Sequence, residues 1–292
     1  MITIRSAGDP HKLEPLTCKR PPLEIEVAGS TLHHVLVERW LPVSEERTVT
    51  ADSDFWPSRG LIEKIRKVPG DFSVIFQGRE VAFSGFGDRT QIEPDADDGS
   101  FQIIYPWHIL AINEDALAGI SENVEGTVRE RVTVDGTLVL GAGSVILPGV
   151  YIEGIAVIGR NCKIGPNCYL RGTTCLGDNC HVGQAVEIKN SILMNHVAAG
   201  HLSYIGDSII CPGTNFGAGT VISNFRHDGK NHRSMVDGEL LDTGRRKFGA
   251  ILGDGVHTGI HSSIYPGRKI WPGVSLRPGT VVQRDLREEK LY

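Results

Sequence analysis

The sequence has no long apolar run, no cysteine pair spaced as Cys-x-x-Cys and no block of basic residues. No apolar stretch approaches the length that crosses a bilayer, and Met1–Arg5 does not begin a signal peptide. A net charge of -5 over 292 residues argues against a general nucleic-acid-binding protein. We therefore expect a cytoplasmic protein of one large or two modest domains, with no membrane or nucleic-acid partner.

The sequence contains instead a strict period of six. Aliphatic residues recur at Val134, Leu140, Ile146, Ile152, Ile158, Ile164, Leu170, Leu176, Val182 and Ile188. An amphipathic helix has a period of about 3.6 and a strand a period of two, so neither explains this spacing. A solenoid does, because each hexad forms one flat side and three hexads close a triangular coil. The sequence therefore predicts a mainly β fold, a parallel β-helix of hexapeptide repeats.

The cysteines fit this repeat. Cys162, Cys168 and Cys180 occupy the small inward position four residues after an aliphatic, where a thiol acts as a compact hydrophobe. We expect reduced, structural thiols and no metal site.

The period is interrupted after Ile188. Leu193 and Ile210 each follow a five-residue step, and a charged excursion spans 223–250 before the period resumes at Leu252. A solenoid needs no such loop for its stability, so we expect the excursion to carry function.

Residues 1–125 lack the period and indicate a small α/β domain, followed by the β-helix domain over 126–292. We expect this first domain to cover the exposed first coil of the solenoid. Its expected elements are a helix starting at Ser30-Thr31, a helix over Gly60–Val68, a hairpin of Phe72–Phe76 and Val81–Phe86, a strand over Phe101–Tyr105, and a helix over Trp107–Ile120.

Two cations mark a possible site on the repeat. Arg171 and Lys189 are eighteen residues apart, so they stack on adjacent coils at the strand spacing of about 4.8 Å. Like charges at that distance repel by roughly 1–3 kcal/mol, which favours an anion such as a phosphate beside them.

The first thirty residues resemble the start of a sugar-1-phosphate nucleotidylyltransferase. The resemblance lies in Ile4–Thr17, Arg20-Pro21-Pro22 and Val27-Ala28-Gly29. Pro10 stands where that family has a phosphate-loop glycine, and Pro22 stands where it has a lysine. The resemblance therefore implies a truncated, degenerate and inactive nucleotidylyltransferase-like domain.

The solenoid resembles the acetyltransferase arm of the bifunctional glucosamine-1-phosphate acetyltransferase and uridylyltransferase, in its archaeal-type version. The motifs are Leu170-Arg171-Gly172, Val186–Asn190, Ala199–Asp207, Asn215–Thr220, Thr243–Asp254 and Ile264–Ile270. The resemblance implies a left-handed β-helix, a homotrimer with sites between subunits, and acetylation of glucosamine- or galactosamine-1-phosphate. Acetyl-CoA would be a substrate, and no tightly bound cofactor is expected.

The same resemblance implies roles for individual residues. His201 matches the general base, and an imidazole with a near-neutral pKa suits removal of a proton from an attacking amine. The other matches are Arg171 and Lys189 as the sugar-phosphate clamp, Tyr204, Asn215 and Asn224 as positioning groups, Lys230 as the archaeal-type loop lysine, and Ala218 as a backbone contact to acyl-CoA. Glu187, two residues before Lys189, is predicted to orient His201.

Departures from the family and other functions stay open. Phe225, Ile260 and Pro278 stand where relatives carry substrate- or CoA-contacting residues, so the acceptor and the CoA contacts are not identified. Three other readings compete: a non-catalytic sugar-nucleotide-binding protein, a residual sugar-1-phosphate nucleotidylyltransferase, and a hexapeptide-class zinc hydratase. His196 and His201 suggest the last of these, but a third histidine two coils upstream is missing.

Overall fold

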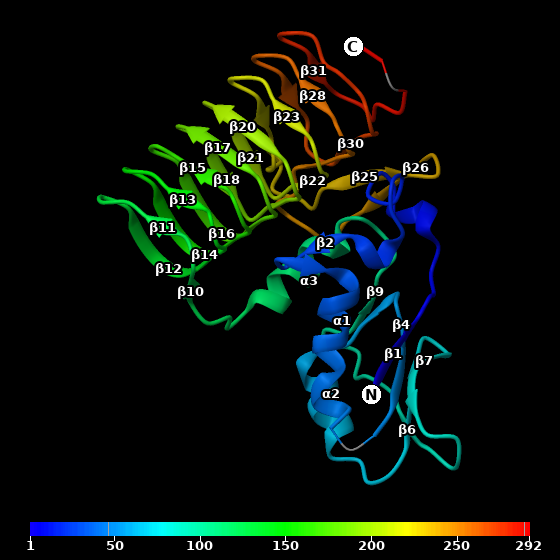
Figure 1. Ribbon diagram of the computed structural model, residues 1–292. Helices are drawn as coiled ribbons and strands as arrows, with labels where there is room; N and C mark the ends of the chain where they lie inside the picture. Colours follow the sequence, from blue (N-terminus) through cyan, green and yellow to red (C-terminus); the bar gives the residue numbers. More distant parts are fainter. Residues whose placement is uncertain (46, 289) are drawn as a thin grey trace.

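The chain forms a long parallel β-solenoid with a small α/β domain along one side (Figure 1). This computed structural model describes residues 1–45, 47–288 and 290–292. No helix within these ranges is both long and apolar enough to cross a membrane.

The N-terminal domain contains a mixed five-stranded sheet and three helices. The sheet has the order β1-β4-β7-β6-β8, from β1 (Ile2–Arg5), β4 (Val49–Asp52), β6 (Phe72–Phe76), β7 (Arg79–Ser84) and β8 (Thr90–Ile92). The helices are α1 (Leu32–Trp40), α2 (Arg59–Arg66) and α3 (His108–Leu117), and the shorter pieces are β2 (Glu26–Val27), β3 (Ser30–Thr31), β5 (Phe55–Trp56) and β9 (Phe101–Gln102).

The expected helices and hairpin are present, but α2, α3, β7 and β9 each end two or three residues earlier than expected. Thr31 caps α1 and Ser58 caps α2, each accepting a backbone N–H with its side-chain oxygen. The strand expected to reach Tyr105 ends at Gln102. Its last N–H groups, on Ile104 and Tyr105, point to the His108 ring nitrogen instead of to a neighbouring strand.

The solenoid has three faces. The front face consists of the first halves of β12 (Thr133–Leu140), β14 (Tyr151–Ile158) and β16 (Tyr169–Leu176), then β18 (Glu187–Lys189), β21 (Tyr204–Gly206), β24 (Val221–Ile222), β29 (Ser263–Ile264) and β31 (Val281–Val282). The flank face consists of β10 (Asn123–Val124), the second halves of those long strands, β19 (Ile192–Leu193), β22 (Ile209–Ile210), β27 (Ala250–Leu252) and β30 (Arg268–Ile270). The third face consists of β11 (Thr127–Val128), β13 (Val145–Ile146), β15 (Lys163–Ile164), β17 (His181–Gln184), β20 (Ala198–His201), β23 (Asn215–Phe216) and β28 (His257–Thr258).

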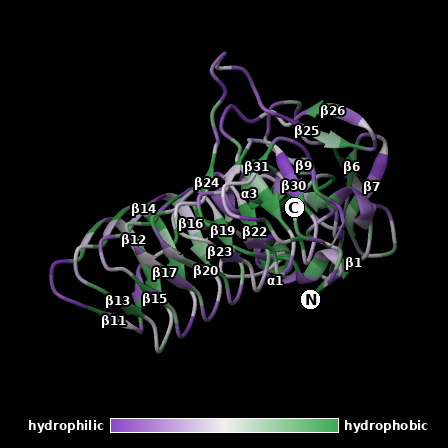
Figure 2. Cartoon of the chain, turned by 90° about the horizontal axis from the view of Figure 1, so that it is seen from above, coloured by the Kyte–Doolittle hydropathy of each residue, from purple (hydrophilic) through white to green (hydrophobic). Residues whose placement is uncertain are grey.

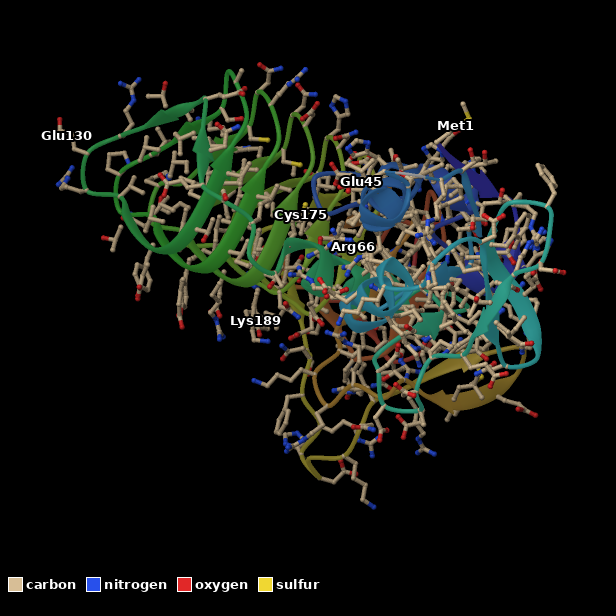
Figure 3. All side chains as sticks on the ribbon, turned by 90° about the horizontal axis from the view of Figure 1, so that it is seen from below. Met1, Glu45, Arg66, Glu130, Cys175 and Lys189 are labelled. Atoms are coloured by element: carbon tan, nitrogen blue, oxygen red, sulfur yellow. The ribbon has the colours of Figure 1, made fainter. Side chains whose placement is uncertain are left out.

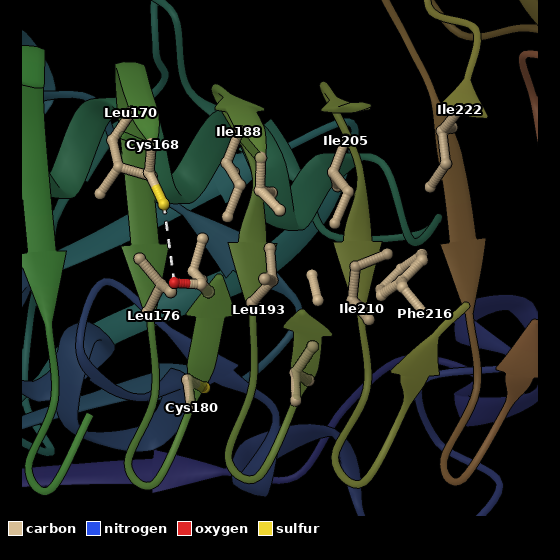
Figure 4. Packing of buried hydrophobic residues seen from close by; sticks show 14 of the residues in the cluster. Cys168, Leu170, Leu176, Cys180, Ile188, Leu193, Ile205, Ile210, Phe216 and Ile222 are labelled. Atoms are coloured by element: carbon tan, nitrogen blue, oxygen red, sulfur yellow. Dashed lines mark hydrogen bonds between the residues drawn. The ribbon is translucent and has the colours of Figure 1, made fainter. Parts of the chain in front are cut away.

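The register confirms the predicted β-helix. Ile152 pairs with Leu170 and Leu170 with Ile188, one above the other, as the period of six requires. The same stacking continues across the five-residue steps, since Leu193 pairs with both Leu176 and Ile210. The inward side chains form one continuous core along the solenoid (Figure 4). The thiol of Cys168 is part of it, 3.6 Å from the carbonyl oxygen of Val182.

The N-terminal domain does not cover the first coil, so that expectation is wrong. The first-coil residues Val124 and Val128 remain 41% and 40% exposed. The domain lies instead along the flank face, where the outward side chains of Ile192, Ile209 and Ile251 join an apolar cluster with residues of the N-terminal domain (Figure 1). The physical reason is that the flank face carries outward aliphatics in several successive coils and therefore has more apolar surface to bury.

Polar contacts attach the first thirty residues to the same side of the solenoid. Arg20 forms a salt bridge with Asp254, and Glu26 accepts hydrogen bonds from the backbone and side chain of Asn195, both at 2.9 Å. The segment that follows the phosphate-loop-like residues is thus engaged in docking to the solenoid.

The excursion folds into an antiparallel hairpin of β25 (Arg233–Val236) and β26 (Glu239–Asp242). A hydrophilic loop precedes it and projects beyond the rest of the chain after β24 (Figure 2). His232 anchors this loop, because its ring nitrogen Nε2 lies 3.0 Å from the carbonyl oxygen of Asn224.

Candidate functional site

Two cation–carboxylate pairs lie on neighbouring strands of the front face. Arg171 and Lys189 are register partners on β16 and β18, as their spacing predicted. The guanidinium of Arg171 lies 2.7 Å from Glu187, and the ammonium of Lys189 lies 2.9 Å from Asp207. Lys189 projects from the solenoid in Figure 3.

These pairs correct one step of the sequence argument. Because Glu187 and Asp207 already balance the charges of Arg171 and Lys189, repulsion between the two cations is no evidence for a bound anion. A bound phosphate would contact Arg171 and Lys189 while Glu187 and Asp207 continue to hold these two side chains in place.

A ladder of polar residues follows the solenoid turn beside the cations. Asn190, Asp207 and Asn224 each stand two residues after an inward aliphatic, and the first two have backbone φ of 49° and 48°. Asn and Asp tolerate this left-handed region better than most residues. The Nδ2 atoms of Asn190 and Asn224 donate to Asp207 at 3.1 and 2.5 Å. The ladder thereby connects Lys189 to the base of the excursion.

Tyr204 extends this network toward solvent. Its hydroxyl oxygen accepts a hydrogen bond from Asn224 Nδ2 at 2.9 Å. Burial raises the pKa of Tyr204, and the carboxylates of Glu187 and Asp207 raise this pKa further. The phenol therefore stays protonated at neutral pH and has a hydrogen to donate.

His201 lies at the corner where the third face meets the front face. Its side chain is exposed, at the end of β20 and three residues before Tyr204. Its carbonyl oxygen accepts from the Ser203 hydroxyl and from the Gly219 N–H, which holds the backbone of this corner. The imidazole is solvent-exposed and makes no hydrogen bond to any residue that the structure describes.

Glu187 contacts Arg171 in the described part of the chain. Its carboxylate bonds to Arg171, and no hydrogen bond joins it to His201 among the residues that the structure describes. Its observed contact is that of a group that positions the clamp.

The remaining predicted residues lie on the third face and on the excursion. Asn215 is exposed on β23, and Ala218 follows it in the next turn. The N–H of Ala218 has no acceptor within the described part of the chain, while its carbonyl accepts from His261. Lys230 lines a separate cavity of about 500 Å³ with Arg226, Asn231, Arg233 and Asp242.

Four residues of this network, Asn190, Asp207, Glu114 and Arg245, were given no role by the sequence reasoning. Asp207 stands at the same position of its coil as Asn190 and Asn224, and this repetition of polar residues was a usable signal. Glu114 of α3 and Arg245 of the excursion also join, through bonds described below. Arg245 lies within the motif Thr243–Asp254 but was given no role, and no repeat or motif marked Glu114. No group of three or more His, Cys, Asp or Glu side chains is arranged to hold a metal in the described ranges.

Comparisons with known proteins place the solenoid in a recognised group. Residues 148–276 match the family described as the GMPPB C-terminal domain. The "Bifunctional sugar-1-phosphate nucleotidylyltransferase/acetyltransferase" of Sulfurisphaera tokodaii is 43% identical over 183 residues, which are 62% of this chain and 45% of that protein. The "Bifunctional protein GlmU" of Methanococcus maripaludis strain C7 is 46% identical over 184 residues, 63% of this chain and 44% of that protein.

The matched region spans less than half the length of these curated relatives. A solved structure, the GDP-perosamine N-acetyl transferase of Caulobacter crescentus with CoA and GDP-perosamine, is 13% identical over 91% of this chain and 90% of that chain. Its TM-score of 0.15 is too low to support an argument. The curated relatives, at more than 40% identity, are decisive. Over the matched region, 62–63% of its length, this chain is therefore a homologue of part of the GlmU-type bifunctional proteins, and its fold there is an acetyltransferase-type β-solenoid.

Proposed function

We propose that the chain is an acetyl-CoA-dependent N-acetyltransferase that acts on glucosamine- or galactosamine-1-phosphate in sugar-nucleotide biosynthesis. The main support is the arrangement at one corner of the solenoid. An exposed His201 adjoins a front face that presents Arg171 and Lys189, in a region more than 40% identical to two bifunctional acetyltransferases.

In this proposal His201 takes a proton from the acceptor amine as the nitrogen attacks the thioester carbonyl. A C–N bond forms, the C–S bond breaks, and CoA leaves as the thiol. Arg171 and Lys189 hold the sugar phosphate through charge-assisted bonds. The N–H of Ala218, which has no acceptor among the described residues, donates to the acyl-CoA. Lys230, which lines the cavity of the excursion, is assigned to acceptor binding.

Tyr204, Asn215 and Asn224 position the sugar. The hydrogen bond between Tyr204 and Asn224 holds both side chains on the front face before the acceptor binds, which lowers the entropy cost of binding. Glu187 supports this arrangement by holding Arg171.

We also propose a homotrimer in which a neighbouring subunit closes the site. The exposure of His201 and Asn215 leaves the corner open within one chain. Light scattering should give three times the mass of the chain, and a monodisperse monomer at micromolar concentration would contradict a shared site.

A thiol-release assay with acetyl-CoA and a panel of amino-sugar phosphates tests the activity. Acceptor-dependent release is expected with glucosamine- or galactosamine-1-phosphate, and much less with the same amino sugars lacking phosphate. Equal rates with and without the phosphate would remove the proposed role of Arg171 and Lys189.

A further inference from the structure

Helix α3 carries a carboxylate of the N-terminal domain into the polar ladder of the front face. Glu114 Oε1 accepts a hydrogen bond from Asn190 Nδ2 at 2.7 Å, and Glu114 Oε2 lies 3.3 Å from Arg245 Nη1. Asn190 belongs to a solenoid turn and Arg245 to the excursion. Glu114 therefore connects the N-terminal domain to both parts of the candidate site.

The contact continues from Asn190 to the clamp. The same Nδ2 atom donates to Asp207 Oδ1 at 3.1 Å, and that oxygen also accepts from Lys189 Nζ at 3.1 Å. Asn190 Oδ1 accepts from the Thr173 N–H, so the amide is held at both ends. Because Asp207 is 2% exposed and Lys189 is largely covered, solvent cannot easily replace these partners.

Arg245 makes Glu114 difficult to replace. Its side chain is 17% exposed, and its Nε atom is buried without a partner among the described residues. Without Glu114 a mostly buried guanidinium would lose its counter-charge, which is unfavourable in a poorly solvated environment. The base of the excursion would then shift, and Asn190 would lose one of its two acceptors.

We propose that Glu114 is a positioning residue of the acetyltransferase site, acting through Asn190 and Asp207 on Lys189. This inference rests on the proposed function. By this inference the N-terminal domain contributes to the acceptor site of the solenoid, because α3 carries Glu114.

The experiment compares steady-state kinetics of the full-length chain and its variants. Glu114→Ala should raise KM for glucosamine-1-phosphate about tenfold, while kcat and the KM for acetyl-CoA change less than about twofold. Glu114→Gln keeps an acceptor for Asn190 but loses the charge that pairs with Arg245. Its acceptor KM should therefore lie between those of the wild type and of Glu114→Ala.

Asp115→Asn is the matched control. It removes a carboxylate from the next position of α3, but Asp115 faces into the N-terminal domain, where it accepts from Trp56 Nε1 at 2.7 Å. Its acceptor KM should equal that of the wild type. An equal rise in Asp115→Asn and Glu114→Ala would indicate general loosening of the domain and would overturn the proposal.

Asn190→Gly tests the route of the effect. Glycine adopts the φ of 49° at this position without strain, so this variant removes the side chain alone. In the Asn190→Gly background, Glu114→Ala should raise KM by clearly less than it does in the wild type, since the contact through Asn190 is already lost and only the contact with Arg245 remains to be removed. Additive effects would overturn the proposed route. If Glu114→Ala does not fold, as judged by circular dichroism, Glu114→Gln and Asn190→Gly decide the question.

Failure of the proposed function is distinguishable from failure of this inference. If the wild type turns over and Glu114→Ala has a normal acceptor KM, the positioning role is wrong and the activity stands. If the wild type does not turn over, calorimetry with glucosamine-1-phosphate alone replaces the kinetics. Binding about tenfold weaker in Glu114→Ala would then support positioning without acetyl transfer, and no binding to the wild type would overturn both.

Discussion

At the scale of single residues, the candidate site combines rigid and free groups. Lys189 is held by Asp207, and Arg171 by Glu187, so both cations are oriented before any ligand arrives. His201, in contrast, is exposed and its imidazole is free of the network. This division suits the proposed reaction, in which Arg171 and Lys189 bind the phosphate and His201 removes a proton from the amine.

The prediction at this scale concerns His201. His201→Ala should lower kcat by about 10²–10⁴-fold and leave acetyl-CoA binding nearly unchanged, because only proton removal is lost. Steady-state kinetics with the best acceptor, together with calorimetric binding of acetyl-CoA, measure the two effects. Wild-type turnover in this variant would refute the mechanism even if the fold and the acceptor are right.

At the scale of elements, adjacent residues of one strand have opposite structural roles. Ile209 and Ile210 on β22 are both fully buried, Ile209 outward against the N-terminal domain and Ile210 inward in the solenoid core. Full burial of such a side chain contributes roughly 1.5–3 kcal/mol, and a carboxylate there would be left unpaired.

Placing a carboxylate at Ile209 and at Ile210 should therefore have different effects on the fold. Ile209→Asp should release the N-terminal domain while the solenoid keeps its β-sheet circular dichroism, and Ile210→Asp should abolish folding. Limited proteolysis should cleave residues before β10 in the first variant and the whole chain in the second. Identical proteolysis of both variants would show that the two layers fold as one cooperative unit.

Helix α3 also contains a pH-sensitive group. Burial lowers the pKa of His108 to about 4, and the positive charge of Arg245 acts in the same direction. Between pH 6.5 and 4 the unfolded chain binds a proton that the folded chain does not, so stability falls as the pH is lowered through this window. Because of the lowered pKa of His108, the free energy of unfolding should fall by about 2 kcal/mol between pH 7 and pH 5.

Urea unfolding at these two pH values checks this expectation. Between pH 7 and pH 5, the loss of unfolding free energy should be about 2 kcal/mol smaller in His108→Gln than in the wild type. It should be unchanged in His33→Gln, which alters an exposed histidine of α1. The same pH dependence in all three proteins would assign the effect to other groups.

At the scale of the whole molecule, the segment that resembles a nucleotidylyltransferase makes contacts with the solenoid. Pro10 begins a short 3-10 helix, and Arg20 is engaged with Asp254 of the solenoid. A proline offers no N–H to a phosphate, and a cation in a salt bridge is unavailable to one. We therefore expect no pyrophosphate release from UTP and glucosamine-1-phosphate. A measurable, enzyme-dependent rate would show that nucleotidyl transfer has survived.

The sequence alone determined the solenoid and the stacking of two cations on its front face. A period of six in aliphatic residues has one common structural solution, so the stacking of Leu170 on Ile188 and of Arg171 on Lys189 could be predicted. The helix start at Ser30-Thr31 was equally local, because a helix N-terminus needs a nearby acceptor, which Thr31 supplies.

Only the tertiary structure decided where the N-terminal domain lies. The outward aliphatics Ile192, Ile209 and Ile251 were visible in the sequence, but a stripe of apolar residues does not name its partner. The contacts of Glu114 with Asn190 and Arg245 join positions 76 and 131 residues apart. No repeat or spacing relates such positions, because docking of one domain on another depends on the shape and charge of two finished surfaces.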